Sequence, residues 1–333
     1  MSDSKWLIVL VNIAAMFAVI LIGWVARHRN YLTAETTSSL SRFVVDITIP
    51  AMVLTSMLRT VDPAKLAVSW YLPLIGGGIL LAGQLVGLAT MPFFSRKDQR
   101  ATFIFLVAVA NWIYLPLPIA QQLYGDDGVR AVLLLNVGAT VVLWTVGIGT
   151  LQRGALNLAT LRNLLMNPGL LATAAGILLA LFVPKYLLAD VPLATVPAGM
   201  LAVKTLLNAL TLVGSLTIPL SLVVTGAQLG GLDISDHRPS RTLTGVILSR
   251  LFIAPAAMVA ITCGLRLLGI HFDEVTRMVA YIIACMPVAV SCSMFTERFG
   301  GDTSLAARSI FYTTLVSILS VPALFYLIQR LGL

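Results

Sequence analysis

One stretch of this sequence decides the fold: NWIYLPLP, residues Asn111–Pro118, in the middle of the apolar segment Phe103–Tyr124. A second apolar segment, Met278–Phe299, is interrupted by Met286-Pro287. Proline removes a helix hydrogen bond and clashes with the preceding turn. Because lipid offers no water to the freed backbone groups, a broken helix survives in a membrane only where protein encloses it or where it lines a cavity. Two such breaks at matching places in two halves of a chain indicate a binding site within the membrane.

The composition is that of an all-α membrane protein. Hydrophobic residues make up 58% of the chain and charged residues only 11%, whereas soluble domains carry about 25% charged residues. The mean hydropathy is +0.94. The net charge of +8 would suggest nucleic acid in a soluble protein. Here the basic residues fall between apolar spans, so they are better explained by membrane orientation than by a nucleic-acid partner.

The hydropathy pattern predicts ten transmembrane helices in two five-helix halves, residues 1–153 and 154–333. The sequence TIP occurs in the second span of each half, at Thr48–Pro50 and Thr217–Pro219, and a Gly-Asp turn follows each broken span. Because five is odd, a second copy enters the membrane inverted, as in many secondary transporters. The expected spans are 6–26, 36–58, 68–94, 101–123, 129–151, 166–184, 199–230, 244–268, 277–298 and 305–330.

The distribution of charged loops predicts the orientation. The basic clusters Arg27–Arg29 and Arg96–Arg100 fall on one side of the predicted membrane, and the acidic turn Gly125–Gly128 falls on the other. Positive residues favour the inside. We therefore expect a multi-pass protein of the cell inner membrane with both termini outside.

The two breaks supply the candidate substrate site. An amide such as Asn111 could pair with freed backbone groups or with a ligand, and serines after the second break could mend the helix or contact the ligand. The ends of broken helices would present positive N-termini suited to an anion, so a buried Lys or Arg is not strictly required. The candidate substrate-binding residues are Asn111, Tyr114, Pro116, Pro118, Gln121, Pro287, Val288 and Ser291.

Two further polar pairs lie inside predicted spans. Arg42 and Asp46 are one helical turn apart, and Lys204 and Asn208 share the same spacing. Charges within a membrane are costly and usually functional. Each pair could equally be a structural clasp at a helix interface, and Lys204 could reach the membrane surface along its flexible stem.

Two local features of the second and third spans predict structure directly. Thr33 could cap the second helix, with Glu35 in its first turn. The third span holds the glycines of Gly76–Gly78 together with Gly83 and Gly87, whose spacing lets helices approach closely. Packing within one chain explains these glycines better than dimerisation does.

The sequence gives no support for an enzyme, a cofactor or a metal site. It holds no grouping of Ser, His and Asp, no phosphate-binding glycine loop and no HExxH motif. Its three cysteines, all in apolar spans, lack the CxxC spacing of a zinc or redox site.

The chain resembles the auxin efflux carriers and their bacterial permease relatives, within the bile, arsenite and riboflavin transporter superfamily. The family signature is an Asn followed at seven residues by a Pro and at fourteen by a Gly, and this chain departs from it by carrying Pro116 where the family usually has Gly. The resemblance extends over nearly the whole chain and is carried by Asn111, Pro118, Gly125, the segment Met286–Gly300, Ser41–Phe43 with Pro50, and Asn167-Pro168.

This resemblance implies two inverted five-helix repeats with crossed broken helices 4 and 9, usually in a homodimer. Helices 1, 2, 6 and 7 would form a scaffold, and helices 3–5 and 8–10 would carry a small organic anion, a carboxylate, through the lipid by an elevator-like motion. One alternative is a sodium-coupled carrier of the bile-acid type, which would need Asn, Gln, Glu and Ser ligands clustered at the crossing, where Asn111 stands nearly alone. Another is a membrane sensor that binds a ligand without moving it.

Overall fold

The computed structural model describes residues 3–60, 69–152, 168–180, 196–231 and 240–332, together with 162, 165, 166, 182, 183 and 187. The boundary between the predicted halves, at residues 153 and 154, lies outside the described residues, as do Arg153 and Asn167. The α-helices of the described part are α1 (Asp3–His28), α2 (Ala34–Phe43), α3 (Ile49–Thr60), α5 (Leu72–Phe94), α6 (Arg100–Ala108), α7 (Pro116–Val142), α8 (Ile148–Gln152), α10 (Pro168–Leu179), α11 (Leu201–Ser215), α12 (Thr217–Gly230), α13 (Arg241–Leu248), α14 (Ala254–Leu267), α15 (Glu274–Ala284), α16 (Cys292–Phe299) and α17 (Thr303–Arg330).

Six helical stretches in the described residues are long and apolar enough to cross a membrane. The stretches Ala14–His28 and Leu170–Leu179 are shorter apolar helices, and α6, α15 and α16 are short because they flank breaks. The fold is therefore helical and suited to a membrane, while the ten-helix count stays a prediction. The six long stretches are Ala34–Arg59, Leu72–Phe94, Pro116–Gln152, Ala198–Gly230, Arg241–Leu267 and Thr303–Arg330.

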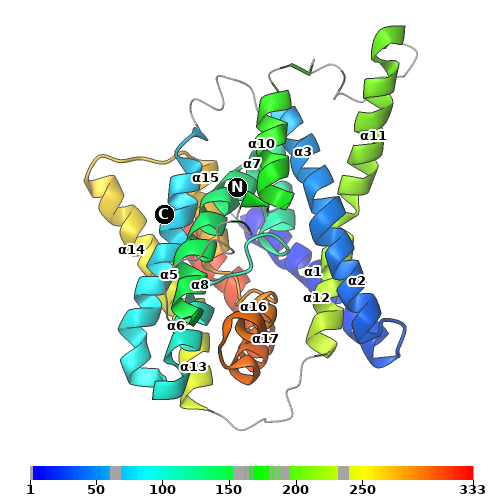
Figure 1. Cartoon of the computed structure of the whole chain (residues 1–333). Coiled ribbons are helices and arrows are strands. Elements are labelled where there is room, and N and C mark those ends of the chain that lie inside the picture. Colours follow the sequence, from blue (N-terminus) through cyan, green and yellow to red (C-terminus); the bar gives the residue numbers. More distant parts are fainter. Residues whose placement is uncertain are drawn as a thin grey trace.

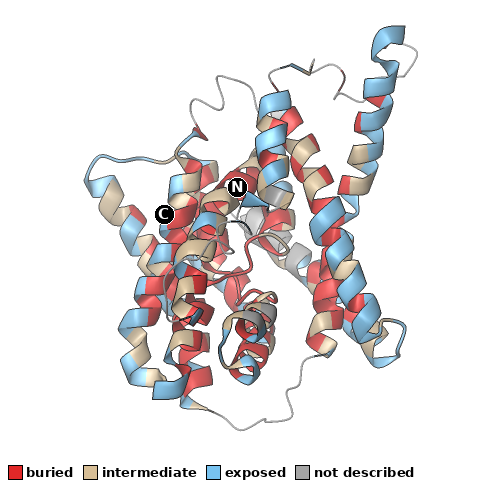
Figure 2. Cartoon of the chain, in the orientation of Figure 1, coloured by how far each residue is buried: buried red, intermediate tan, exposed pale blue. Residues whose placement is uncertain are grey.

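The helices form two groups that lie on opposite sides of the molecule (Figure 1). On the right, α3 packs against α10 and α11, and α12 packs against α1 and α2. On the left, α5 packs against α6, α13 and α14, and also against α7, which reaches the centre. Figure 2 shows buried residues where the helices face one another and exposed residues along the outer helices. Large apolar side chains such as Leu206 and Leu212 are exposed on α11, as expected of a surface that faces lipid.

Glycines of the third predicted span hold the left group together. A Cβ at Gly83 would lie 2.8 Å from Ala108 Cα, and one at Gly87 would lie 3.0 Å from Ile104 Cα, both on α6. A larger residue would push α6 away from α5. The expectation that these glycines serve packing within one chain is confirmed at these two positions.

Polar side chains fix the ends of several helices. Thr33 caps α2 by accepting a hydrogen bond from the Thr36 N–H at 3.2 Å, as predicted. The Gly125 φ of 57° kinks the helix after the first break, where the sequence predicts a Gly-Asp turn. Single π-helical turns, in which the backbone bonds skip one extra residue, interrupt the path at Val44–Thr48, Leu143–Gly147 and Ser249–Ile253. Such turns often occur at functional positions.

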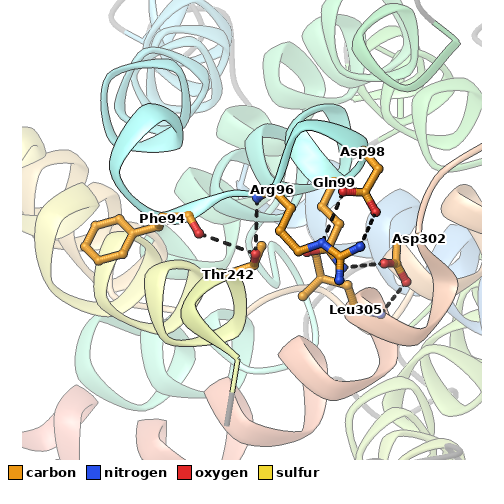
Figure 3. Close-up of polar contacts among 7 residues, drawn as sticks. All are labelled: Phe94, Arg96, Asp98, Gln99, Thr242, Asp302 and Leu305. Atoms are coloured by element: carbon orange, nitrogen blue, oxygen red, sulfur yellow. Dashed lines mark hydrogen bonds and ion pairs between the residues drawn. The ribbon is translucent and has the colours of Figure 1, made fainter. Parts of the chain in front are cut away.

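A cluster at one end of the molecule joins the start of α6 to the start of α17 (Figure 3). Gln99 Nε2 donates to Asp302 Oδ2 at 2.6 Å, while Asp302 Oδ1 caps α17 by accepting from Leu305 N–H at 2.8 Å. The Asp302 N–H donates to Thr102 Oγ1 at 2.9 Å. Beside them, Arg96 and Asp98 form an exposed ion pair. The first broken helix therefore begins beside the turn that follows the second.

Candidate functional site

Two interrupted helices cross at the centre of the chain. The first break separates α6, which ends at Ala108, from α7, and the second separates α15, which ends at Ala284, from α16. Ala110 and Val288 pair as a single antiparallel bridge. The Asn111 N–H donates to Pro287 O at 2.9 Å, and the Ala289 N–H donates to Val109 O at 3.1 Å. Each break thus satisfies part of the other's freed backbone, as buried polar groups require.

The prolines of the first break lie beside the unwound segment, not in it. Pro116 begins α7, and Pro118 follows within the same turn. The unwound stretch spans residues 109–115, so the chain unwinds near Pro116–Pro118, as predicted, while the prolines themselves begin α7. The physical reason is that proline suits the first helical turn, where its missing N–H would have no partner anyway. In the second break, Pro287 does lie within the unwound stretch.

Asn111 caps its own segment. Its side chain is 4% exposed, and its Oδ1 accepts a hydrogen bond from the Tyr114 N–H at 3.0 Å. Among the described residues no acceptor is found for its Nδ2 group. The amide therefore mends the backbone with one end and offers a donor at the crossing with the other.

The second break depends on a neighbouring helix. The Val288 N–H donates to Thr313 Oγ1 of α17 at 3.2 Å, and both residues are buried. Ser291 precedes α16 and makes no side-chain capping bond. Ser293 Oγ donates back to Val290 O at 2.9 Å. This last contact is the backbone-mending role that the sequence favours for a serine here.

Arg250 is the residue that sequence reasoning missed. It lies in the π-helical turn between α13 and α14, and it is 2% exposed. Its guanidinium donates to Val107 O at 2.9 Å, to Met286 O at 3.1 Å and to Ala284 O. The signal was present in the sequence, because an arginine inside the predicted span 244–268 is a functional candidate by default.

The arrangement makes the crossing electropositive. The C-terminal end of a helix carries about half a negative charge and the N-terminal end about half a positive charge. Arg250 binds carbonyls at the C-terminal ends of α6 and α15, so its positive charge balances both. The N-terminal ends of α7 and α16, at Pro116 and Cys292, follow the two unwound segments and carry partial positive charge. This set of groups can attract one small anion.

Gln121 lies away from the bridge, in a pocket of about 230 Å³ between α3, α7 and α11. In Figure 1, α3 and α11 belong to the right-hand group of helices, and α7 belongs to the left-hand group. Tyr114 is half-buried at the end of the unwound stretch. The polar residues that line the pocket are Thr55, Ser56, Arg59, Gln121, Asp126, Thr211 and Ser215.

The other two polar pairs do not form the clasps that their spacing allows. Arg42 and Asp46 are both exposed on the α2 side, and among the described residues they form no ion pair with each other. The Arg42 Nη2 instead lies 3.5 Å from Ser39 Oγ. Lys204 is buried and its Nζ donates to Leu187 O at 2.9 Å, whereas Asn208 is exposed. Lys204 and Asn208, one helical turn apart, therefore lie in different environments.

Comparisons with known proteins identify the family of this chain. The family model for membrane transport proteins matches residues 8–159 and again residues 152–325. The chain belongs to the membrane transport protein family, that of the auxin efflux carriers. It is 22% identical over 319 residues to an uncharacterized transporter of Methanothermobacter thermautotrophicus, covering 93% of this chain and 95% of that protein. It is 23% identical over 310 residues to an uncharacterized transporter of Methanocaldococcus jannaschii, covering 91% and 93%. The chain is therefore an integral membrane transporter.

Proposed function

We propose that this transporter moves a small organic anion, a carboxylate, and binds it where the two broken helices cross. One observation carries the proposal: the breaks pair at Ala110 and Val288, which brings Asn111 and two half-helix N-termini to one place. The Asn111 Nδ2 group would donate to a carboxylate oxygen. The helix ends supply positive potential without reorganising when the anion arrives.

Inverted repeats are supported by three independent features. The breaks occupy matching positions, the family model matches the two halves of the chain in turn, and each half has a Gly-Asp turn after its break. The turn at Gly301-Asp302 contacts Thr102 at the start of α6. The helix that follows the first break, α7, packs against α15, which precedes the second break. We therefore propose ten helices, with helices 4 and 9 as the broken pair.

An elevator-type motion is the mechanism that this arrangement suits. The crossing belongs to the group of helices around α5, and the pocket that contains Gln121 is lined by α7 of this group and by α3 and α11 of the other. Sliding one group along the other would carry the crossing from one membrane face to the other while its hydrogen bonds stay intact. A homodimer would anchor the stationary group around α3 and α11.

Uptake into proteoliposomes tests the proposal. The purified protein is reconstituted and screened against labelled monocarboxylates and dicarboxylates. Asn111→Ala should lose most of the uptake that the wild type shows. The control is Asn30→Gly, which removes an exposed amide in a turn with a φ of 59° that suits glycine. Binding of a carboxylate without any uptake would favour the sensor alternative, and no binding at all would refute the anion site.

Orientation can be tested separately from transport. Asp127 lies in the turn region after Gly125, which the charge distribution places outside. On a background that lacks the native cysteines, Asp127→Cys should react with a membrane-impermeant reagent in intact cells. Labelling only after the membrane is opened would overturn the proposal that both termini are outside.

A further inference from the structure

The backbone carbonyls at the crossing carry partial negative charge, which transporters with broken helices commonly neutralise with a bound ion. In carriers with broken helices, unwound backbone carbonyls and half-helix C-terminal ends coordinate the coupling Na⁺ or H⁺. In this chain the corresponding carbonyls belong to Val107, Ala284 and Met286. All three accept hydrogen bonds from Arg250.

Arg250 is suited to hold several carbonyls at once. A guanidinium presents five donors in a rigid planar fork, and here it reaches acceptors from both broken helices. Within the described part of the chain it forms no ion pair with a carboxylate. Its charge is therefore balanced by the carbonyls alone, which is the environment that a bound cation would have.

The helix that carries Arg250 is itself fixed to the crossing group. The π-helical turn Ser249–Ile253 places Arg250 toward the crossing, and Ser249 Oγ donates to Thr90 Oγ1 of α5 at 3.0 Å. Leu251, the next residue, is fully buried. The guanidinium would thus travel with the crossing and never leave it.

We propose that Arg250 is a built-in cation that replaces a coupling sodium ion, so that the crossing is complete without Na⁺. This inference rests on the proposed transport function for its consequence, which is that a sodium gradient does not drive transport. Its structural part concerns only the three carbonyls and their cation. That part can be measured without any substrate.

The test is the thermal denaturation of purified protein in detergent. The wild type should melt at the same temperature in sodium chloride and in choline chloride of equal ionic strength. Arg250→Ala should melt several degrees lower, and guanidinium at concentrations well below denaturing ones, or Na⁺, should restore part of the loss. The control Arg241→Ala removes an exposed arginine from the start of α13, so added guanidinium should not raise its melting temperature.

The possible outcomes are distinguishable. A wild type stabilised by Na⁺ over choline would overturn the proposal, as would an Arg250→Ala variant that responds to guanidinium and Na⁺ no more than the control does. If Arg250→Ala does not fold, Arg250→Gln and Arg250→Lys replace it. The lysine variant, which keeps the charge, should melt above the glutamine variant, and Na⁺ should stabilise the glutamine variant over choline. Equal melting temperatures of these two variants, with no response of the glutamine variant to Na⁺, would also overturn the proposal. A failure to transport carboxylates would leave these melting results unchanged, and so would refute only the proposed function.

Discussion

The two breaks present the same backbone problem and meet it in different ways. The first break is mended within its own segment, because Asn111 accepts from the Tyr114 N–H three residues later. The second is mended from outside, because the Val288 N–H needs Thr313 of α17. Arg250 binds carbonyls on both sides of the crossing, that of Val107 in the first broken helix and those of Ala284 and Met286 in the second. A change at Asn111 or Thr313 should therefore destabilise one break, and a change at Arg250 should destabilise both.

Loss of Arg250 should lower the stability of the protein more than the other changes described below. Arg250→Ala leaves three buried carbonyls without their donor, and leaving one buried polar group unsatisfied costs about 1–3 kcal/mol. The free energy of unfolding should fall by several kcal/mol, measured by denaturation in detergent. Hydrogen exchange should increase at both breaks together. An increase confined to one break would show that Arg250 does not stabilise both breaks.

Asn111 should affect transport more than stability. Asn111→Ala removes the free Nδ2 donor together with one backbone contact, at a cost of about 1–3 kcal/mol in binding or site stability. Uptake should be abolished or strongly weakened while the protein still inserts and melts cooperatively. Asn111→Asp should be worse, since its charge would oppose the anion. Wild-type rates in both variants would leave Asn111 as a structural amide only.

A change at Thr313 should affect the stability of the second break alone. Thr313→Val keeps the shape but removes the acceptor of the Val288 N–H, so about 1–2 kcal/mol of stability should be lost. Thr313→Ser, which retains the hydroxyl, is the matched control. Exchange of the amides around Val288 should rise in the valine variant, and those around Asn111 should be unchanged. Equal changes in hydrogen exchange around Val288 and Asn111 would show that the Thr313 hydroxyl does not act on the second break alone.

The smallest effect is expected at the loop end of the second broken helix. Burial raises the pKa of the Asp273 carboxyl, but hydrogen bonds from Thr276 and Tyr71 outweigh it and leave the pKa below its ordinary value. The unfolded value is about 3.9, so the charged carboxylate stabilises the fold above that pH and the contribution disappears as the pH falls below it. The wild type should melt slightly above Asp273→Asn at pH 7, and this difference should shrink as the pH falls below the unfolded pKa and through the lower folded pKa. A difference that does not shrink on acidification would mean that the charge is not what stabilises this end.

The prolines, the Gly-Asp turns and the helix-packing glycines made much of this fold predictable. The prolines and the Gly-Asp turns act on their own backbone, and the spacing of the glycines marks a close helix contact, so these effects can be inferred from the local sequence. The pairing of Ala110 with Val288 could not be inferred, because two small apolar residues give no sign of register. Arg250 was missed for a related reason: its carbonyl partners come from two distant segments and carry no side-chain signal. The i, i+4 spacing suggested that Arg42 pairs with Asp46 and Lys204 with Asn208, but spacing along a helix does not determine which partner a side chain contacts.

Equilibrium binding of a labelled carboxylate to the purified protein in sodium-free buffer tests the central claim most directly. The measurement compares the wild type with Asn111→Asp and with the Asn30→Gly control. We expect saturable binding to the wild type and the control, and none to Asn111→Asp, because we propose that the anion binds at the crossing and that Arg250 supplies the cation there. Equal binding to all three proteins, or wild-type binding that appears only when sodium is added, would contradict the account.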